Sequence, residues 1–313
     1  MSAAWPLVGH AAAERAFLDA HASGRLHHAW LIEGPSGIGK ARLAMRFSAF
    51  LLGARGPDTA PLDAAEDDPA VRPLLAESHP DLHWSARRPD EKGKLKQDIP
   101  VDEVRALNQF FTLKPALGGW RVGVIDSLDE LNRSGANALL KTLEEPPPQA
   151  AIFLISHGAR PVLPTIRSRC RTLRLNRLSD AETETVLVQE QVNNPAETAR
   201  LAAGRPGQAL KFAGATAKGG LTAADTVIKA WPRLNDKAFG DAVKHAGADE
   251  AAFEAFSLRV LAWLAEGATD DPKRSGAYLS TSALVAEADA LAMPRAQAAA
   301  KLVMGLQKAA KAR

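Results

Sequence analysis

Apolar residues follow two different spacings in the first part of the chain, and the two spacings alternate. Short, nearly unbroken apolar runs predict strands that are buried on both faces, whereas apolar residues three or four positions apart predict helices that bury one face. The predicted strands are residues 29–32, 81–84, 120–126, 151–156 and 171–175, and the predicted helices are residues 5–24, 43–51, 99–111 and 136–145. This alternation predicts an α/β fold, with a parallel sheet of about five strands and helices on both faces.

After residue 176 the strand pattern disappears and only helical spacing remains. Ser179 and Glu182 have the spacing of a capping box, which predicts the start of a helix. The pair Gly219 and Gly220 predicts a linker. We therefore predict three domains, which are an α/β core over residues 1–176, a small all-helical domain over residues 177–218 and an all-helical C-terminal domain over residues 219–313.

The composition is that of a globular protein, with 46% hydrophobic residues, 24% charged residues and a net charge of +3 over 313 residues. The single cysteine, Cys170, excludes an internal disulfide and a cysteine-based zinc ribbon. No apolar run is long enough for a membrane span and no signal peptide precedes the core, so we expect a cytoplasmic protein. Residues 53–80 mix prolines with acidic residues and predict a surface excursion rather than a long helix or central strand.

Residues 34–41 carry the first candidate chemistry. They read Gly-Pro-Ser-Gly-Ile-Gly-Lys-Ala and stand between a predicted strand and a predicted helix. Glycines let backbone N–H groups converge on phosphate oxygens, and a helix N-terminus favours negative charge. The candidate nucleotide-binding residues of this P-loop are Gly34, Gly37, Gly39 and Lys40. Ala41 stands where the pattern has a Ser or Thr that binds Mg²⁺, so the predicted loop lacks a metal ligand.

Two further polar positions adjoin predicted strands. Asp126 ends the strand at residues 120–126, where P-loop folds place a carboxylate that holds the Mg²⁺ shell; it could equally cap the following turn. Ser127 comes next and is too weak a base to activate water. His27 and His28 are adjacent at a strand edge, so their side chains point to opposite faces, which favours packing over metal binding.

Three segments carry a resemblance to a known family. They are Gly-Arg-Leu-His-His-Ala at residues 24–29, Ala-Asn-Ala-Leu-Leu-Lys-Thr-Leu-Glu-Glu-Pro-Pro at residues 136–147, and Ser168-Arg169-Cys170. Together with the P-loop they resemble the AAA+ subunits of bacterial clamp loaders, closely over residues 24–176 and weakly beyond. The run at residues 136–147 is the most specific of them. The resemblance implies an AAA+ core at residues 1–176, a helical lid at 177–218 and a collar domain for oligomerisation at 219–313.

The resemblance also implies partners. Clamp loaders are heteropentamers that open a sliding clamp and close it on primed DNA, so the expected partners are motor subunits of the gamma/tau type, a delta subunit, the clamp and the DNA. ATP lies at subunit interfaces in this family. On that basis Arg169 is expected to act in trans, as an arginine finger on the ATP of a neighbouring subunit.

The chain departs from the family's motor subunits at three positions. Ala41 replaces the hydroxyl residue of the P-loop, Ser127 replaces a glutamate, and Gly207 replaces an arginine of the lid. We interpret these changes together as the loss of ATP hydrolysis, with weak or absent binding of ATP or ADP and no required cofactor. Residues 53–80 contain none of the cysteines that hold zinc in many relatives, so no zinc is expected.

Two other functions remain open. Because Lys40 and Asp126 are retained, the chain could be an autonomous ATP-hydrolysing motor subunit. A stand-alone DNA-binding AAA+ protein is the second alternative, since a basic cluster could touch phosphates, although such a cluster is more often a solvated turn. The cluster consists of Arg87, Arg88, Lys92, Lys94 and Lys96. Arg169 could also pair with a carboxylate of its own chain, and whether the isolated chain catalyses any reaction stays open.

Overall fold

The computed structural model describes residues 3–89, 96, 98–192, 194–211, 215–233, 235–268, 271–291 and 293–311. The chain divides into two compact units, Met1–Leu178 and Ser179–Arg313. Each unit has apolar cores of its own.

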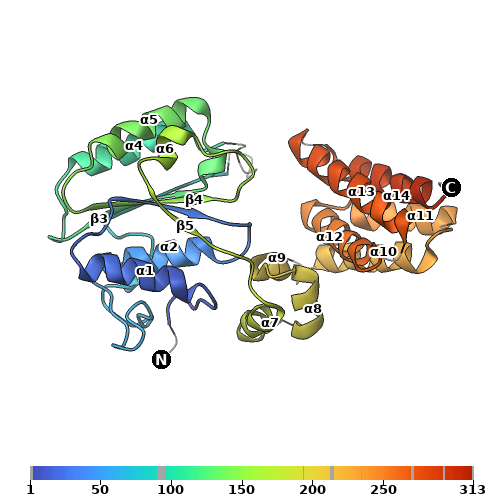
Figure 1. Ribbon diagram of the computed structural model, residues 1–313, viewed down its shortest axis with the longest axis horizontal. Helices are drawn as coiled ribbons and strands as arrows, with labels where there is room; N and C mark the ends of the chain where they lie inside the picture. The colour runs from blue at the N-terminus through green and yellow to red at the C-terminus, as the bar shows by residue number, and fades with distance from the viewer. Residues whose placement is uncertain are drawn as a thin grey trace. The chain divides into compact units, whose positions relative to one another are not determined.

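A five-stranded parallel sheet forms the centre of the first unit (Figure 1). Its strands are β1 (Ala29–Glu33), β2 (Leu82–Ala86), β3 (Arg121–Asp126), β4 (Ala150–Ser156) and β5 (Arg171–Arg174). The order across the sheet is β2-β3-β4-β1-β5, and all four neighbouring pairs are parallel. Parallel pairing brings the carboxyl ends of the strands to one edge, where α/β folds usually bind ligands.

Helices cover both faces of this sheet (Figure 1). Helices α1 (Ala11–Ala22) and α2 (Lys40–Leu51) lie on one face, and α4 (Val101–Thr112), α5 (Arg133–Glu144) and the short α6 (Pro164–Arg167) lie on the other. Successive residues of β1 point to opposite faces of the sheet. Leu31 joins the core under α4 and α5, while the ring of Trp30 lies 5.7 Å from that of Phe17 in α1. Phe17 in turn stacks on Phe47 of α2 at 4.0 Å between ring centroids. The predicted α/β core is confirmed.

The N-terminal helix begins at Ala11, so its predicted start near Trp5 is wrong. Gly9 and His10 have φ values of 76° and 62°, left-handed values that a helix cannot include. The preceding segment packs on the P-loop instead, and Leu7 Cδ1 lies 2.7 Å from the place where a Cβ on Gly39 would stand. A tertiary contact therefore overrides the helical spacing of the sequence.

Residues 53–80 hold one short helix, α3 (Arg72–Leu75), and otherwise turns, in line with the predicted excursion. Two of its acidic residues are used locally. Asp63 pairs with Arg46 of α2 at 2.5 Å, and Asp68 accepts a hydrogen bond from the backbone N–H of Ala70. In the part of the chain that the structure describes, no three His, Cys, Asp or Glu side chains are grouped so as to hold a metal ion.

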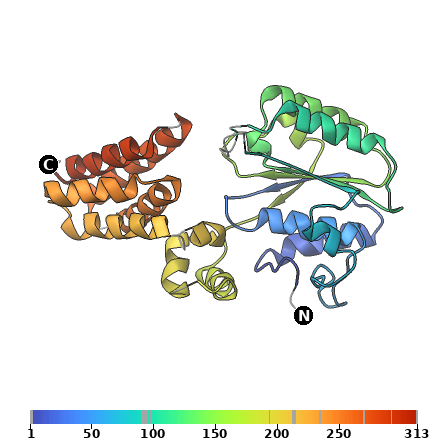
Figure 2. The same cartoon turned by 180° about the vertical axis from the view of Figure 1, so that it is seen from behind.

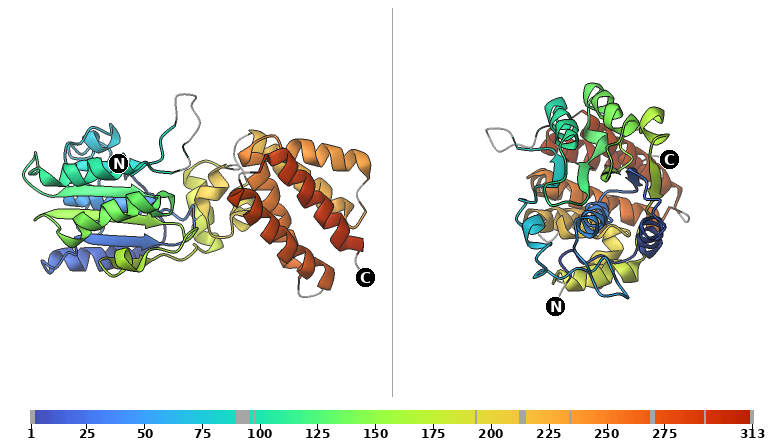
Figure 3. Two further views of the ribbon diagram at one scale, coloured as in Figure 1. Left: turned by 90° about the horizontal axis from the view of Figure 1, so that it is seen from above. Right: turned by 90° about the vertical axis from the view of Figure 1, so that its left-hand side faces the viewer.

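The second unit is entirely helical over its described residues (Figure 2). Its helices are α7 (Asp180–Gln189), α8 (Pro195–Ala202), α9 (Pro206–Lys211), α10 (Ala215–Ala230), α11 (Asp236–Ala246), α12 (Glu250–Glu266), α13 (Pro272–Ala290) and α14 (Arg295–Lys311). The predicted capping box is present: Ser179 Oγ accepts from the N–H of Glu182, whose carboxylate accepts from the N–H of Ser179. A small core unites α7 to α9, and a larger one unites α10 to α14, of which α13 and α14 lie side by side (Figure 3).

The linker predicted at Gly219 and Gly220 is wrong, because both glycines lie inside α10. A Cβ on Gly220 would stand 2.1 Å from the carbonyl oxygen of Ala252 in α12, so this glycine lets the two helices approach closely. Within the described residues, no helix is both long and apolar enough to cross a lipid bilayer.

Candidate functional site

The P-loop joins the end of β1 to the start of α2 at the carboxyl edge of the sheet. Gly34 has φ 156°, and a Cβ there would stand 2.4 Å from the carbonyl oxygen of Leu175. Gly37 and Gly39 have φ values of 83° and 99°. These positive values and the close backbone approach exclude side chains, so the glycines are required by the shape of the loop.

Lys40 is the first residue of α2, and its side chain turns back onto its own loop. Its Nζ donates hydrogen bonds to the carbonyl oxygens of Gly34 at 2.7 Å and Pro35 at 2.5 Å. Only 3% of the residue is exposed. Burial lowers the pKa of Lys40 from 10.5 to about 8, although the nearby carboxylates of Asp126 and Asp129 act in the opposite direction. The ammonium group is thus held by backbone carbonyls of the same loop.

The depressed pKa of Lys40 predicts that the protein gains stability as the pH rises from 8 to 10.5. Between these values the unfolded chain binds more protons at this position than the folded chain, so the free energy of unfolding increases with pH. The gain is at most about 3 kcal/mol. Urea unfolding of the wild type and Lys40→Met at pH 7, 8, 9 and 10 measures it as the difference between the two proteins. A difference that stays constant over this range would contradict the burial of a charged Lys40.

Asp126 ends β3 at the same edge of the sheet as the P-loop. Burial raises the pKa of its carboxyl group, and the ammonium group of Lys40 acts against this rise. His157 Nε2 lies 4.0 Å from Asp126 Oδ1. Ser127 is 1% exposed, and its hydroxyl has no hydrogen-bond partner among the described residues. The charges of Asp126 and Lys40 therefore act on each other, and the adjacent Ser127 side chain offers no carboxylate.

Sequence reasoning missed Asp129, which lies in the short 3-10 helix η1 (Leu128–Glu130). Its carboxylate accepts hydrogen bonds from the backbone N–H groups of His157 at 2.5 Å and Arg160 at 3.2 Å, and from the hydroxyl of Ser156 at 3.3 Å. Asp129 thereby holds the loop that follows β4 and adds a negative charge near Lys40. An acid three residues after the strand-end Asp126 was the available signal.

The Ser-Arg-Cys motif lies between α6 and β5 and contains the predicted finger, Arg169. The guanidinium group of Arg169 donates to the carbonyl oxygen of Thr165 at 2.9 Å and pairs with Glu144 at 2.8 Å. The side chains of this pair are 36% and 49% exposed. The sequence analysis left open that Arg169 pairs with a carboxylate of its own chain. The structure shows such a pair, with Glu144 at the end of α5, and it is exposed.

Arg167, two residues earlier, is bound differently. It forms a bidentate ion pair with Glu33, with N–O distances of 2.8 Å and 2.5 Å. Glu33 ends β1 immediately before the P-loop and is only 18% exposed, so Arg167 ties α6 to the base of the loop. Sequence reasoning singled out neither residue, because their contact joins positions 134 residues apart.

The remaining candidates are used in packing, belong to the second unit or fall outside the described residues. The rings of His27 and His28 stack at 4.5 Å, so the prediction that they point to opposite faces is wrong; both residues precede β1, where strand alternation does not apply. The ring of His28 also bonds to the backbone of Leu143. Arg87 and Arg88 pair with Glu130 and Glu103, whereas Lys92 and Lys94 of the basic cluster lie outside the described residues. Burial raises the pKa of the Cys170 thiol to about 12. Gly207 is the second residue of α9 in the other unit.

Comparison with known proteins gives the family. A family model described as DNA polymerase III, delta subunit, matches residues 9–179. The delta-prime subunit of DNA polymerase III from Pseudomonas aeruginosa is 41% identical over 143 residues, which cover 46% of this chain and 41% of that protein. The delta-prime subunit from Escherichia coli is 35% identical over 191 residues, covering 60% of this chain and 55% of that protein. The chain belongs to the delta-prime family.

The resemblance of this delta-prime family member to clamp-loader subunits is thereby confirmed, over the core. The chain spans about half the length of the curated relatives it matches. Its fold is also similar to the crystal structure of a DNA polymerase III gamma subunit-related protein from Thermotoga maritima, with a TM-score of 0.51 and 16% identity. That match covers 91% of this chain and 95% of the other. At this identity the likeness concerns the fold alone.

Proposed function

We propose that this delta-prime family member is a non-hydrolysing subunit of the DNA polymerase III clamp loader. In this role it helps to load a sliding clamp onto primed DNA in the cytoplasm. Its direct partners are motor subunits of the gamma/tau type and a delta subunit in a heteropentamer. Helices α7 to α9 serve as the lid, and α10 to α14 serve as the collar.

The observation that carries this proposal is the position of Arg169 within the family motif. Its ion pair with Glu144 is exposed on both sides, and such pairs contribute only about 0–1 kcal/mol. The guanidinium group can therefore exchange Glu144 for a more highly charged partner at little cost. A guanidinium fork matches the oxygens of a phosphate, so Arg169 is suited to the γ-phosphate of ATP bound by a neighbouring subunit.

The P-loop supports the non-hydrolysing part of the proposal. Ala41 supplies no oxygen to Mg²⁺, and the buried Ser127 supplies no base to a water molecule. Lys40 already donates to two carbonyl groups of its own loop, so binding a phosphate would require these bonds to break. We therefore propose weak or absent binding of ATP and ADP, and no zinc or other cofactor.

Reconstitution tests the assignment directly. We expect the full chain to co-elute with candidate motor and delta subunits, and the nucleotide in the complex to equal the number of motor subunits. A chain that stays apart from all candidate partners at micromolar concentration would contradict the assignment. One additional nucleotide for each copy of this chain would show that the P-loop is occupied.

The isolated chain is expected to show no ATP turnover above the buffer background. Restoring the missing hydroxyl with Ala41→Thr is expected to increase Mg²⁺-dependent ATP binding without creating turnover, because Ser127 still cannot act as a base. A phosphate-release assay and equilibrium binding with Mg²⁺ or EDTA measure the two effects. Turnover by the wild type that Lys40→Ala abolishes would instead favour the autonomous motor.

A further inference from the structure

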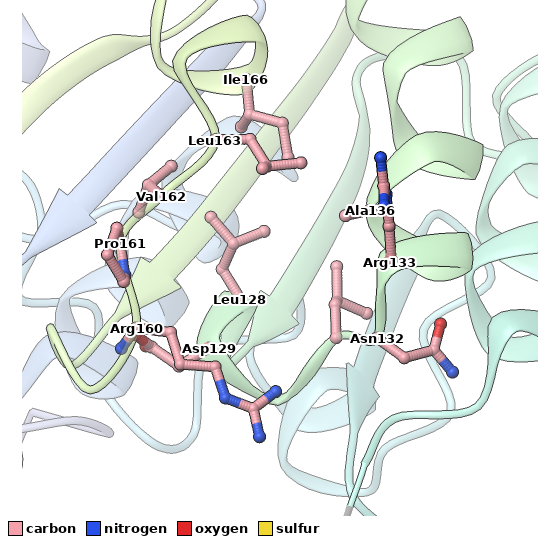
Figure 4. A pocket seen from close by; sticks show the side chains of 11 residues that line it. Leu128, Asp129, Asn132, Arg133, Ala136, Arg160, Pro161, Val162, Leu163 and Ile166 are labelled. Atoms are coloured by element: carbon pink, nitrogen blue, oxygen red, sulfur yellow. The ribbon is translucent and has the colours of Figure 1, made fainter.

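A hollow of about 300 Å³ opens in the first unit beside the loop that follows β4 (Figure 4). Its walls come from η1, the start of α5 and the segment that leads into α6. Seven of its eleven lining residues are apolar, and Figure 4 shows Leu128, Val162 and Leu163 around it. Leu163 is 38% exposed although it caps α6, so an apolar side chain faces solvent here.

The rim of this hollow carries unbalanced positive charge. Arg133 and Arg160 are both exposed, and Arg133 forms no ion pair or hydrogen bond through its side chain with any described residue. Among the residues that the structure describes, the side chain of Arg160 has one long ion pair, with Asp98 at 4.0 Å. Asp129 also lines the hollow, but its oxygens already accept three hydrogen bonds from the loop after β4. The two arginine side chains at the rim therefore favour the binding of an anionic group.

We propose that this hollow docks a segment of a partner protein that inserts one apolar side chain and places a carboxylate beside Arg133 or Arg160. A volume of about 300 Å³ is at the lower limit of ligand pockets and suits one or two side chains. The apolar walls favour a protein segment over nucleic acid, whose backbone is recognised through phosphates by basic and polar groups. The inference goes beyond the proposed function, because it requires neither bound nucleotide nor Arg169.

The test is a selection from a phage library that displays random twelve-residue peptides. The full chain serves as bait, and Leu163→Asp serves for counter-selection. We expect enriched peptides to combine an apolar residue with a nearby Asp or Glu. For one such peptide, Arg160→Glu is expected to weaken binding at least tenfold, and Leu163→Asp to abolish it. Arg72→Glu, which makes the same charge change on α3, is expected to leave the affinity unchanged.

Circular dichroism and thermal melting establish that the variants are folded before binding is compared. The proposal fails if no peptide is enriched, if the enriched peptides lack acidic residues, or if Arg72→Glu weakens binding as much as Arg160→Glu. It also fails if short duplex DNA competes with the peptide and the affinity for DNA falls in Arg160→Glu. The surface would then be a phosphate-binding site. Loss of the proposed clamp-loader assembly would leave these binding results unchanged, so the two hypotheses are tested separately.

Discussion

Replacing Arg169 with alanine is expected to slow ATP hydrolysis at one subunit interface of the reconstituted clamp loader by on the order of 10³-fold. The guanidinium group would stabilise charge that develops on the γ-phosphate of the neighbouring subunit, and alanine removes it. Stability of the chain should change by less than about 1 kcal/mol, because the pair with Glu144 is exposed. The effect therefore lies in catalysis by the assembly rather than in folding of this subunit.

Single-turnover hydrolysis in the reconstituted complex, with and without primed DNA, measures this effect. Arg174→Ala is the matched control, since Arg174 is 80% exposed and lies 3.8 Å from Glu33, its partner. Glu144→Gln should retain full activity, because it only releases Arg169 from its own chain. Arg169→Lys should recover little, since an ammonium group lacks the planar fork. Unchanged turnover with an intact Arg169→Ala complex would exclude the finger.

The neighbouring Arg167 differs from Arg169 in how its own chain binds it. Both arginines stand in the same short segment, but only Arg169 belongs to the Ser-Arg-Cys motif. In the fold, Arg167 is bound at two points by Glu33, whose carboxylate is only 18% exposed and stands at the base of the P-loop. Arg169 has a carbonyl oxygen and an exposed carboxylate instead. Arg169 is therefore held less firmly by its own chain than Arg167.

The parallel sheet was predictable because its strands are buried on both faces. Residues such as Trp30, Leu31 and Phe153 leave no polar side to a strand, and this pattern is visible in the sequence itself. The glycines of the P-loop were equally predictable, because positive φ values and close backbone contacts tolerate no other residue. Both features depend on neighbouring residues, so the local sequence pattern was sufficient to predict them.

The contacts of the candidate site depend on residues far apart in the chain, and there the sequence was insufficient. The predicted helix start at Trp5 is wrong because Leu7 and His10 pack on the P-loop, where the ring of His10 bonds to the carbonyl oxygen of Ile38. The roles of Asp129 and Glu33 arise from loops that meet at the edge of the sheet. Nothing in local spacing indicates which loops will meet.

Gly219 and Gly220 present the same limitation in the second unit. A glycine pair is typical of a turn or linker, yet helix α10 continues through both. The two positions differ in their surroundings. A Cβ on Gly219 would find His245 Cδ2 at 3.9 Å, an ordinary contact, whereas a Cβ on Gly220 would collide with the backbone of Ala252. One glycine is dispensable and the other permits the packing of α10 on α12.

Gly220→Ala is therefore expected to destabilise the second unit by about 1–3 kcal/mol, because α12 must move away from α10 to accept the methyl group. Gly219→Ala, the matched control, is expected to stabilise it by about 0.5–1 kcal/mol, because alanine loses less backbone entropy in a helix. Hydrogen exchange of peptides from residues 215–230 and 250–266 measures both changes within this unit. A linker would respond equally and weakly to the two substitutions, so effects of opposite sign distinguish a packed helix from a flexible connection.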